Sequence, residues 1–496
     1  MPHPAHTRRL VLLPRALGLV SAVSLLASCA TTPAPDAEST LRRAEQAMGA
    51  TALKTLMFSA RGTGATFGQA WQPSMTWPGL NYSGITRWMD YDNAALREDF
   101  GRSRSEPNGG GATPLMGQGE ARASGSVRGT LAWNGAGATA TAAPVAVEAR
   151  LHDLWTSPHG VLKAARAHKA QAATASEGGQ TYTTLSFAVP GTLSATAWID
   201  AAGMVTRIDS RLPHPVAGDT LSSTTFSGYR DHGGVKFPAR IVQTLGRSPV
   251  LDLSVTDVQP NAAVDIAVPE AVRNFTERVV ASSVAPGVWY LAGGSHHSVL
   301  VEMRDHLMVV ESPLYDGRAM AVFAQARQLV PGKPIRFVIN SHHHFDHAGG
   351  LRAAVAEGAT LVTSEQAKPY FERVFSNANS IKPDAMARSG RTANIVGVSA
   401  KRVFSDGQRV VEVHELQGSV HAQGFLMVYL PTEKLLVQAD AYTPAAPNTP
   451  PPPVVNANHV NLVQNIERLG LQVERILPLH GRVVPIAELH AAIGRR

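Results

Sequence analysis

Cysteine is nearly absent from this sequence of 496 residues, which contains a single Cys, at position 29. One cysteine excludes an intramolecular disulfide and a metal site built from several thiolates. Aromatic residues make up only 6% of the chain, and 45 basic residues face 38 acidic ones. No run of five basic residues occurs, so we do not expect a nucleic acid as partner.

A hydrophobic run long enough to cross a membrane is also lacking near the N-terminus. The apolar stretch at residues 16–27 would extend about 18 Å as a helix, whereas the hydrocarbon core is about 30 Å thick. The stretch follows Arg8 and Arg9 and ends in Leu-Ala-Ser-Cys at residues 26–29, which is typical of an export signal.

This ending resembles the lipobox of bacterial lipoproteins, in which the cysteine receives the lipid. The resemblance implies a signal peptide over residues 1–29 and a membrane anchor through lipidated Cys29. The protein would then lie in the bacterial cell envelope, facing the periplasm, or be exported. The alternative is an ordinary signal peptide with an incidental cysteine. Residues 30–40 are polar and contain proline, as expected for a tether.

Residues 41–275 show mainly period-two patterning with turn signals, which predicts an antiparallel β domain. Expected elements include strands at residues 181–189, 195–199, 204–209 and 235–237, a helical stretch near 145–172, and a glycine-rich loop without strands at 103–129. The arrangement loosely resembles the half-barrel domains of envelope lipoproteins that cradle acyl chains. The alternative is a domain that only spaces or orients the second region.

Residues 280–496 alternate short apolar strands with helical patterns, which predicts a layered α/β domain. Strands are expected at residues 287–291, 298–302, 307–310, 335–340, 424–430, 434–439 and 475–479, and helices at 319–329 and 459–469. Gly470 follows the second helix, in a position that suits a left-handed cap.

A histidine-rich motif, SHHHFDHAGG at residues 341–350, directly follows the strand predicted at 335–340. Imidazole and carboxylate are ligand types that suit zinc. His342 and His344 alternate in extended backbone, which turns both rings to one side, and Asp346 and His347 follow. We expect the two spacer residues of the motif to pack around the ligands rather than to bind. The alternative, a solvated histidine-rich loop, does not predict further ligands downstream.

The motif resembles that of the metallo-β-lactamase superfamily of binuclear metallohydrolases, and the resemblance covers about residues 284–496. It implies an αββα sandwich and three further ligands: His421 before the strand at 424–430, Asp440 after the next strand, and His480 after the strand at 475–479. The implied arrangement places His342, His344 and His421 on one metal, Asp346, His347 and His480 on the other, and Asp440 on both.

The resemblance implies a hydrolase in which a hydroxide bridging two Zn²⁺ ions cleaves an ester, lactone, thioester or amide bond of a small molecule. Iron or manganese could replace zinc. Asp346 is the expected catalytic residue, because it can orient the hydroxide and accept its proton. Zinc β-lactamases generally lack an aspartate at the bridging position, so Asp440 favours the glyoxalase, lactonase and nuclease branches.

Three alternatives stay open at this point: a mononuclear iron enzyme of the persulfide dioxygenase kind, a β-lactam hydrolase, and a non-catalytic envelope lipoprotein that binds a lipid or a partner. Tyr442 could donate to an oxyanion or only pack, and the proline-rich segment 443–453 could be a lid or a connector. Six other histidines have no ligand spacing and are expected to be surface or structural: His296, His297, His306, His414, His459 and His490.

Overall fold

The computed structural model describes residues 35–106, 119–450 and 454–495. The predicted signal peptide, Cys29 and the first residues of the predicted tether lie outside these ranges. From residue 35 onwards the chain forms one compact unit. Within the described ranges, no helix combines the length and the apolar character that crossing a membrane requires.

The first helix, α1 (Ala37–Met48), begins inside the segment predicted as a tether. The Asp36 side chain accepts a hydrogen bond from the backbone N–H of Ser39 at 2.7 Å and so caps the helix. This cap satisfies one of the free N–H groups of the first turn. Leu41, Ala44 and Met48 form the buried face of the helix, so packing against the following sheet holds it in place.

The N-terminal region is built on a single sheet of thirteen strands, in the order β6-β5-β4-β3-β2-β1-β15-β14-β11-β10-β9-β8-β7. The strands are β1 (Thr55–Ala65), β2 (Gly79–Asp90), β3 (Ala95–Arg104), β4 (Ala121–Arg128), β5 (Leu131–Asn134), β6 (Thr141–Ala142), β7 (Gln171–Glu177), β8 (Gln180–Val189), β9 (Leu193–Ile199), β10 (Val205–His214), β11 (Gly218–Ser227), β14 (Arg240–Leu245) and β15 (Ser248–Pro260). Every pair in this sheet is antiparallel. The predicted antiparallel β-rich character is confirmed.

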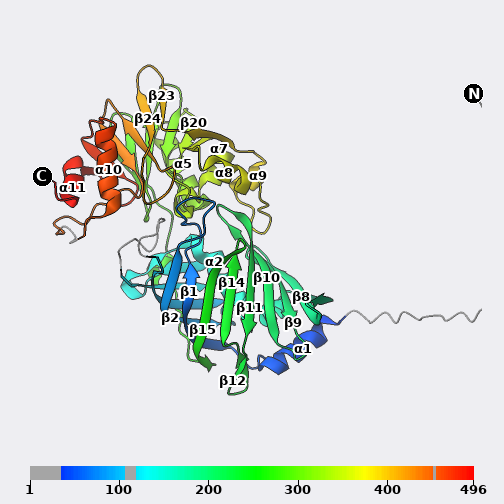
Figure 1. Cartoon of the computed structure of the whole chain (residues 1–496). Helices are drawn as coiled ribbons and strands as arrows, with labels where there is room; N and C mark the ends of the chain where they lie inside the picture. The colour runs from blue at the N-terminus through cyan, green and yellow to red at the C-terminus, as the bar shows by residue number, and fades with distance from the viewer. Residues whose placement is uncertain (1–34, 107–118, 451–453, 496) are drawn as a thin grey trace, which may run out of the picture. The chain divides into compact units, whose positions relative to one another are not determined.

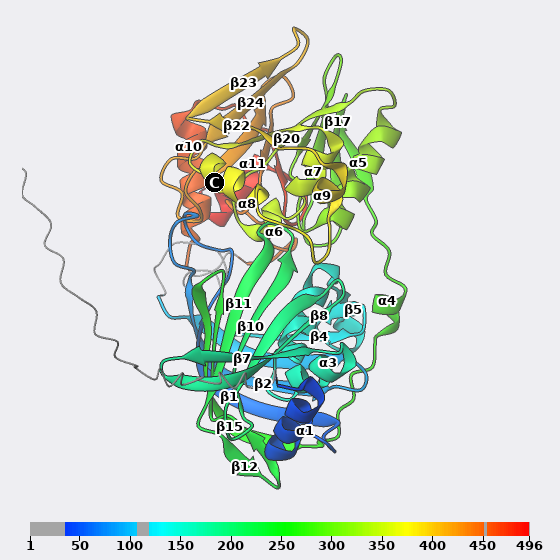
Figure 2. The same cartoon turned by 90° about the vertical axis from the view of Figure 1, so that its right-hand side faces the viewer.

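Helices fill the concave face of this curved sheet (Figure 2). The predicted helical stretch is two helices, α2 (Val147–Trp155) and α3 (Gly160–Ala167). Their side chains share one buried cluster with α1 and the strands. The prediction of a glycine-rich loop over residues 103–129 was wrong for residues 121–128, because β4 pairs with both β3 and β5. Residues 107–118 of this segment lie outside the described ranges. Small and polar residues make up most of β4, so neighbouring strands rather than its own apolar pattern define it.

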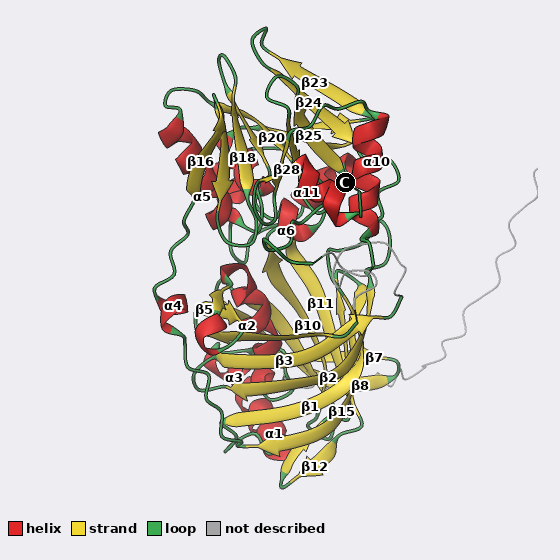
Figure 3. Cartoon of the chain, turned by 90° about the vertical axis from the view of Figure 1, so that its left-hand side faces the viewer, coloured by secondary structure: helices red, strands yellow, loops and turns green. Residues whose placement is uncertain are grey.

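The C-terminal region contains two sheets with helices on their outer faces (Figures 1 and 3). One sheet comprises β16 (Val280–Ala285), β17 (Val288–Ala292), β18 (Ser298–Glu302), β19 (Leu307–Val310), β20 (Ile335–Ile339), β21 (Thr360–Ser364) and β22 (Asn394–Val398). The other comprises β23 (Lys401–Ser405), β24 (Val410–Glu415), β25 (Leu426–Leu430), β26 (Leu435–Gln438), β27 (Arg475–Pro478) and β28 (Val484–Pro485). One buried cluster joins inner residues of both sheets.

The outer layers complete the predicted αββα order. Helices α5 (Asp316–Leu329), α7 (Leu351–Glu357) and α8 (Lys368–Phe375) pack on the first sheet. Helices α10 (Ala457–Arg468) and α11 (Ile486–Ala492) contribute to the cluster that contains the second sheet. After α10, Gly470 has φ 64°, so the predicted left-handed cap is confirmed.

Candidate metal centre

The predicted ligands lie where strands of the two C-terminal sheets end. The motif follows β20 and runs into the short helix α6 (Phe345–Ala348). Asp440 lies two residues after the end of β26, and His480 lies two residues after the end of β27. Because β26 and β27 are parallel, their C-terminal ends meet at one edge of the sheet. His421 stands in the turn that precedes β25.

Asp440 is the point on which four imidazoles converge. Its Oδ2 lies 3.3 Å from Nε2 of His342 and 3.0 Å from Nε2 of both His347 and His421. Its other oxygen, Oδ1, lies 2.9 Å from Nε2 of His480. One carboxylate therefore contacts histidines from both of the predicted ligand sets, which is the geometry that a bridging ligand needs.

The inward-facing nitrogens form two adjacent groups. Nε2 of His342 lies 3.0 Å from Nδ1 of His344 and 3.2 Å from Nε2 of His421. In the second group, Nε2 of His347 and Nε2 of His480 are 3.2 Å apart. The two groups that could each hold an ion are His342, His344, His421 and Asp440, and His296, His347 and His480.

Asp346 lies beside His347, with which it is predicted to share a metal. Its Oδ1 accepts a hydrogen bond from Nε2 of Gln69 at 2.8 Å, and its Oδ2 lies 3.2 Å from Nε2 of His296. Nε2 of His347 is farther away, at 3.8 Å from the same Oδ2. Asp346 therefore stands beside the second group of nitrogens and is held there by two neighbouring side chains.

His296 was wrongly predicted to be a surface or structural residue. It lies between β17 and β18, is 6% exposed, and packs its ring edge-to-face on His480 with centroids 4.2 Å apart. Because a carboxylate only accepts, the contact with Asp346 is an Nε2–H donated to Oδ2. His296 therefore belongs to the site, where it orients Asp346. Its position after a strand was the only signal in the sequence.

Hydrogen bonds on the outer side of the rings determine which nitrogen of each ring is protonated and which is left to face the centre of the site. Nε2 of His344 lies 2.8 Å from the carbonyl oxygen of Ala70, and Nδ1 of His480 lies 2.8 Å from that of Ser295. A carbonyl only accepts, so each of these nitrogens carries a proton. Nδ1 of His344 and Nε2 of His480 are therefore the nitrogens left for a metal, and both face the centre of the site. Such outer contacts fix the tautomer of metal-binding histidines.

Glu311 likewise fixes which nitrogen carries the proton in two other rings, those of His347 and His342. The side chain of this residue is fully buried, and its Oε2 accepts from Nδ1 of His347 at 3.1 Å and from the hydroxyl of Ser341. That hydroxyl lies 2.9 Å from Nδ1 of His342, from which it accepts. Nδ1 of each ring therefore carries a proton, and Nε2 is the nitrogen that each ring turns towards Asp440. Glu311 has φ 71°, a left-handed conformation that is costly for a non-glycine residue.

The protonation states at the centre depend on its charges. Burial alone would lower the pKa of His347, but the carboxylates of Asp440 and Asp346 outweigh it and raise that pKa well above its ordinary value, so this ring carries a charge that a bound cation would replace. Burial, together with the nearby charge of His347, lowers the pKa of His342 well below its ordinary value, so the ring is neutral. Burial alone would raise the pKa of Asp440, but the charges of His347 and His421 outweigh it and hold that pKa well below the usual range. Neutral imidazole and ionised carboxylate are the forms that coordinate divalent ions.

The donor set fits divalent transition metals. Two ligands of a tetrahedral zinc site with Zn–N bonds of about 2.0–2.1 Å are separated by about 3.3 Å. The separations of 3.0 and 3.2 Å between inward nitrogens are close to this value. Imidazole and carboxylate also suit iron and manganese. The site is open on one side, where the side chains of Asp346, His480 and Asp440 are 36%, 19% and 17% exposed.

The spacer residues of the motif pack as expected. His343 donates from Nε2 to the carbonyl oxygen of Ala70 at 2.9 Å. The ring of Phe345 lies 5.1 Å from that of Phe67. Tyr442 is 2% exposed and packs edge-to-face on His459, so its position suits the packing alternative rather than an oxyanion donor.

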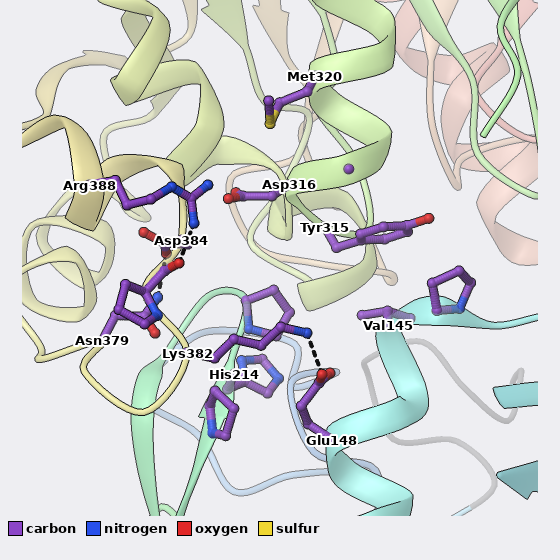
Figure 4. Close-up of a pocket in the computed structure, with 15 residues that line it drawn as sticks. Val145, Glu148, His214, Tyr315, Asp316, Met320, Asn379, Lys382, Asp384 and Arg388 are labelled. Carbon is purple, nitrogen blue, oxygen red and sulfur yellow. Dashed lines mark hydrogen bonds and ion pairs between the residues drawn. The ribbon is translucent and has the colours of Figure 1, made fainter. Parts of the chain in front are cut away.

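A separate cavity of about 370 Å³ is lined by none of the seven predicted ligands. Figure 4 shows Val145, Glu148 and His214 of the N-terminal region facing Tyr315 and Met320 of the C-terminal region across it. Lys382 and Glu148 form an ion pair at its wall. Among the residues that line the cavity, His214 contacts the motif, because its ring lies 4.5 Å from that of Phe345.

Comparison with known proteins identifies the C-terminal fold. The family model of the Metallo-beta-lactamase superfamily matches residues 291–445. A metallo-beta-lactamase from Pontibacter korlensis is similar in structure, with 15% identity and a TM-score of 0.35 over 44% of this chain and 100% of that one. The DIM-1 metallo-beta-lactamase has 13% identity and a TM-score of 0.35 over 44% of this chain and 97% of its own. No curated protein matches the chain.

Proposed function

We propose, on the premise that residues 291–445 form a metallo-beta-lactamase superfamily domain, that the protein is a metal-dependent hydrolase of small molecules. The bond cleaved would be an ester, lactone, thioester or amide. The observation that carries the proposal is the convergence of four imidazole nitrogens on the Asp440 carboxylate within 2.9–3.3 Å. A purely structural role would not require several histidines that each turn one ring nitrogen towards the same carboxylate.

Two divalent ions, when bound, supply a nucleophile near neutral pH by lowering the pKa of water, and they polarise the bond under attack. The side chains of the protein would hold the two ions in place. His342, His344 and His421 would hold one ion, and His347 and His480 the other, with Asp440 between them. Zinc is the first choice for this donor set, with iron or manganese as alternatives.

Asp346 is the residue that would handle the proton. Its carboxylate is partly exposed and is oriented by Gln69 on one oxygen and by His296 on the other. A carboxylate held at the open side of the site can accept the proton of an attacking water and later deliver it to a leaving group. The same position also allows Asp346 to coordinate the ion held by His347.

The proposal is tested by screening the purified chain against lactones, thioesters, β-lactams and phosphodiesters with and without a chelator. We expect at least about a 100-fold loss of the detected activity in the chelator and its recovery on adding zinc, because the nucleophile depends on the ions. Asp346→Asn should lose turnover even when zinc is supplied in excess. Activity that survives complete chelation would contradict the proposal, and one iron per chain would favour the oxygenase alternative.

We also propose that the protein is anchored in the cell envelope through lipidated Cys29. The supporting observation is the position of the only cysteine at the end of the apolar stretch 16–27. Acyl chains contribute about 0.8 kcal/mol per buried methylene, so several chains hold a protein on a membrane without a spanning helix. In cell fractionation, wild type should sediment with membranes and Cys29→Ser should not. Equal sedimentation of the two would refute the anchor.

A further inference from the structure

One loop of the N-terminal sheet reaches the ligand-bearing segments of the C-terminal region. This loop, residues 66–78, joins β1 to β2. Besides its contacts with the motif, Nε1 of Trp71 donates to the carbonyl oxygen of Ser419 at 2.9 Å. The backbone N–H of Gln423 donates to the carbonyl oxygen of Trp71 at 2.7 Å. The loop is therefore hydrogen-bonded to the turn that carries His421, at Ser419 before this histidine and at Gln423 after it.

The carbonyl oxygen of Ala70, in the 66–78 loop, fixes the tautomer of His344, which belongs to the first group of nitrogens. It accepts from Nε2 of both His343 and His344, at 2.9 and 2.8 Å. The donation by His344 leaves Nδ1 as the only nitrogen of that ring with a lone pair, and Nδ1 is the atom that faces His342. No described contact of the C-terminal region replaces this acceptor at Nε2 of His344.

Gln69 of the same loop acts on the second group. Its Nε2 donates to Oδ1 of Asp346 at 2.8 Å, and the residue is 8% exposed. The opposite oxygen of Asp346 is held by His296. Loss of Gln69 would remove the hydrogen bond that holds Oδ1 and let this oxygen turn towards solvent.

Gly68 allows the loop to approach the motif so closely. It has φ 81°, and a Cβ at this position would lie 2.0 Å from the ring of Phe345. Its carbonyl oxygen accepts from the backbone N–H of Phe345 at 3.3 Å. Phe345 stands between His344 and Asp346 in the sequence, so any residue larger than glycine would push the loop away from both.

We propose that the N-terminal region is a positioning module for the metal centre, with the 66–78 loop setting the tautomer of His344 and the orientation of Asp346. The inference rests on the proposed metal-dependent function. It assigns Gln69 as a positioning residue and gives the β-rich region a role in retaining metal. Outer contacts of this kind typically change metal affinity by about 10- to 100-fold.

The first test replaces Gln69 by methionine in the full chain and measures zinc affinity by competition with a chromophoric chelator. Methionine keeps the volume of the side chain and removes the donor to Asp346. We expect about 10- to 100-fold weaker binding of one of the two ions and unchanged binding of the other. The absorption of the cobalt-loaded protein should change for the same ion only. The melting temperature of the metal-free variant should stay that of wild type.

The second test compares Gly68→Ala with Gly179→Ala. Gly179 lies in the turn between β7 and β8, has φ 78°, and would meet no atom within 4 Å of an added Cβ. Both variants carry the same backbone cost of a left-handed alanine, but only Gly68→Ala displaces the loop. We expect weaker binding of both ions in Gly68→Ala and wild-type binding in Gly179→Ala.

Wild-type zinc affinity in Gln69→Met would overturn the inference, even if Gly68→Ala does not fold. So would equal affinities in the two glycine variants, or a lower melting temperature of metal-free Gln69→Met with unchanged affinity, which would mark a merely structural role. A wild-type chain that binds no metal would instead refute the proposed function itself, so the two failures are distinguishable.

Discussion

Replacing Asp440 by alanine is expected to abolish tight binding of both ions and to reduce kcat/KM by about 10³-fold or more, equal to about 4 kcal/mol of transition-state stabilisation. The reason is geometric, because Asp440 is the only carboxylate within 3.3 Å of imidazoles from both predicted ligand sets in the part of the chain that the structure describes. Its removal also leaves several buried imidazoles without the anion that balances a bound cation. Metal analysis after gel filtration, alongside steady-state kinetics, measures both effects.

Asp305→Ala is the matched control, because this aspartate is exposed and pairs only with His306 and Arg336. It should retain two ions and wild-type turnover. Asp440→Asn distinguishes charge from volume, and it should resemble the alanine variant. An Asp440→Ala protein that still holds two ions would show that the carboxylate does not bridge them.

Arg318→Ala is expected to lower the free energy of unfolding by about 3–5 kcal/mol. Arg318 lies on α5, is fully buried, and pairs with Glu277. Its guanidinium also donates to the carbonyl oxygens of Arg278, Leu291 and His296, at 2.9, 3.4 and 3.3 Å. The substitution removes these three hydrogen bonds and creates a cavity beside the backbone of His296. Urea unfolding of the metal-free protein measures the change.

Arg327→Ala is the matched control, because it makes the same substitution at an exposed position of the same helix. Arg327 is 50% exposed and pairs with Glu357, an arrangement worth at most about 1 kcal/mol. The loss of unfolding free energy in Arg318→Ala should therefore be several times that in Arg327→Ala. Comparable losses in both variants would contradict a special role for the buried guanidinium.

The first ligands could be recognised in the sequence because they form one short motif after an apolar strand, and the family resemblance then implied His421, Asp440 and His480. His342, His344 and His347 belong to one short motif after β20, and Asp440 and His480 follow β26 and β27 at the same spacing. Strand ends are local features, so the sequence pattern reveals them. The structure brings these side chains together because both sheets end at a common edge.

Contacts that depend on the folded chain had no such local signal. Gln69 and Asp346 are 277 positions apart, and nothing near Gln69 indicates that its amide meets a carboxylate. His296 was dismissed because no second ligand lies at a recognisable spacing from it. Its position depends on Arg318, which binds its carbonyl oxygen from α5. Tertiary contacts, and not the periodicity of the sequence, determine where Gln69 and His296 lie in the fold.

Local patterns also failed where neighbouring strands or a cap define an element. The strand β4 consists mainly of small and polar residues and exists because β3 and β5 flank it. Helix α1 follows a proline-containing polar stretch, and the cap by Asp36 starts it earlier than the apolar pattern indicates. Stronger apolar patterns, such as β25 and β26, were predicted correctly.

We propose that the histidines and Asp440 hold two divalent ions side by side. Anomalous diffraction from crystals grown with zinc, recorded on both sides of the zinc edge, measures this directly. We expect two peaks, one among His342, His344 and His421 and one beside His347 and His480, with Asp440 between them. Crystals with no anomalous peak at these side chains, or with zinc bound only elsewhere, would contradict it.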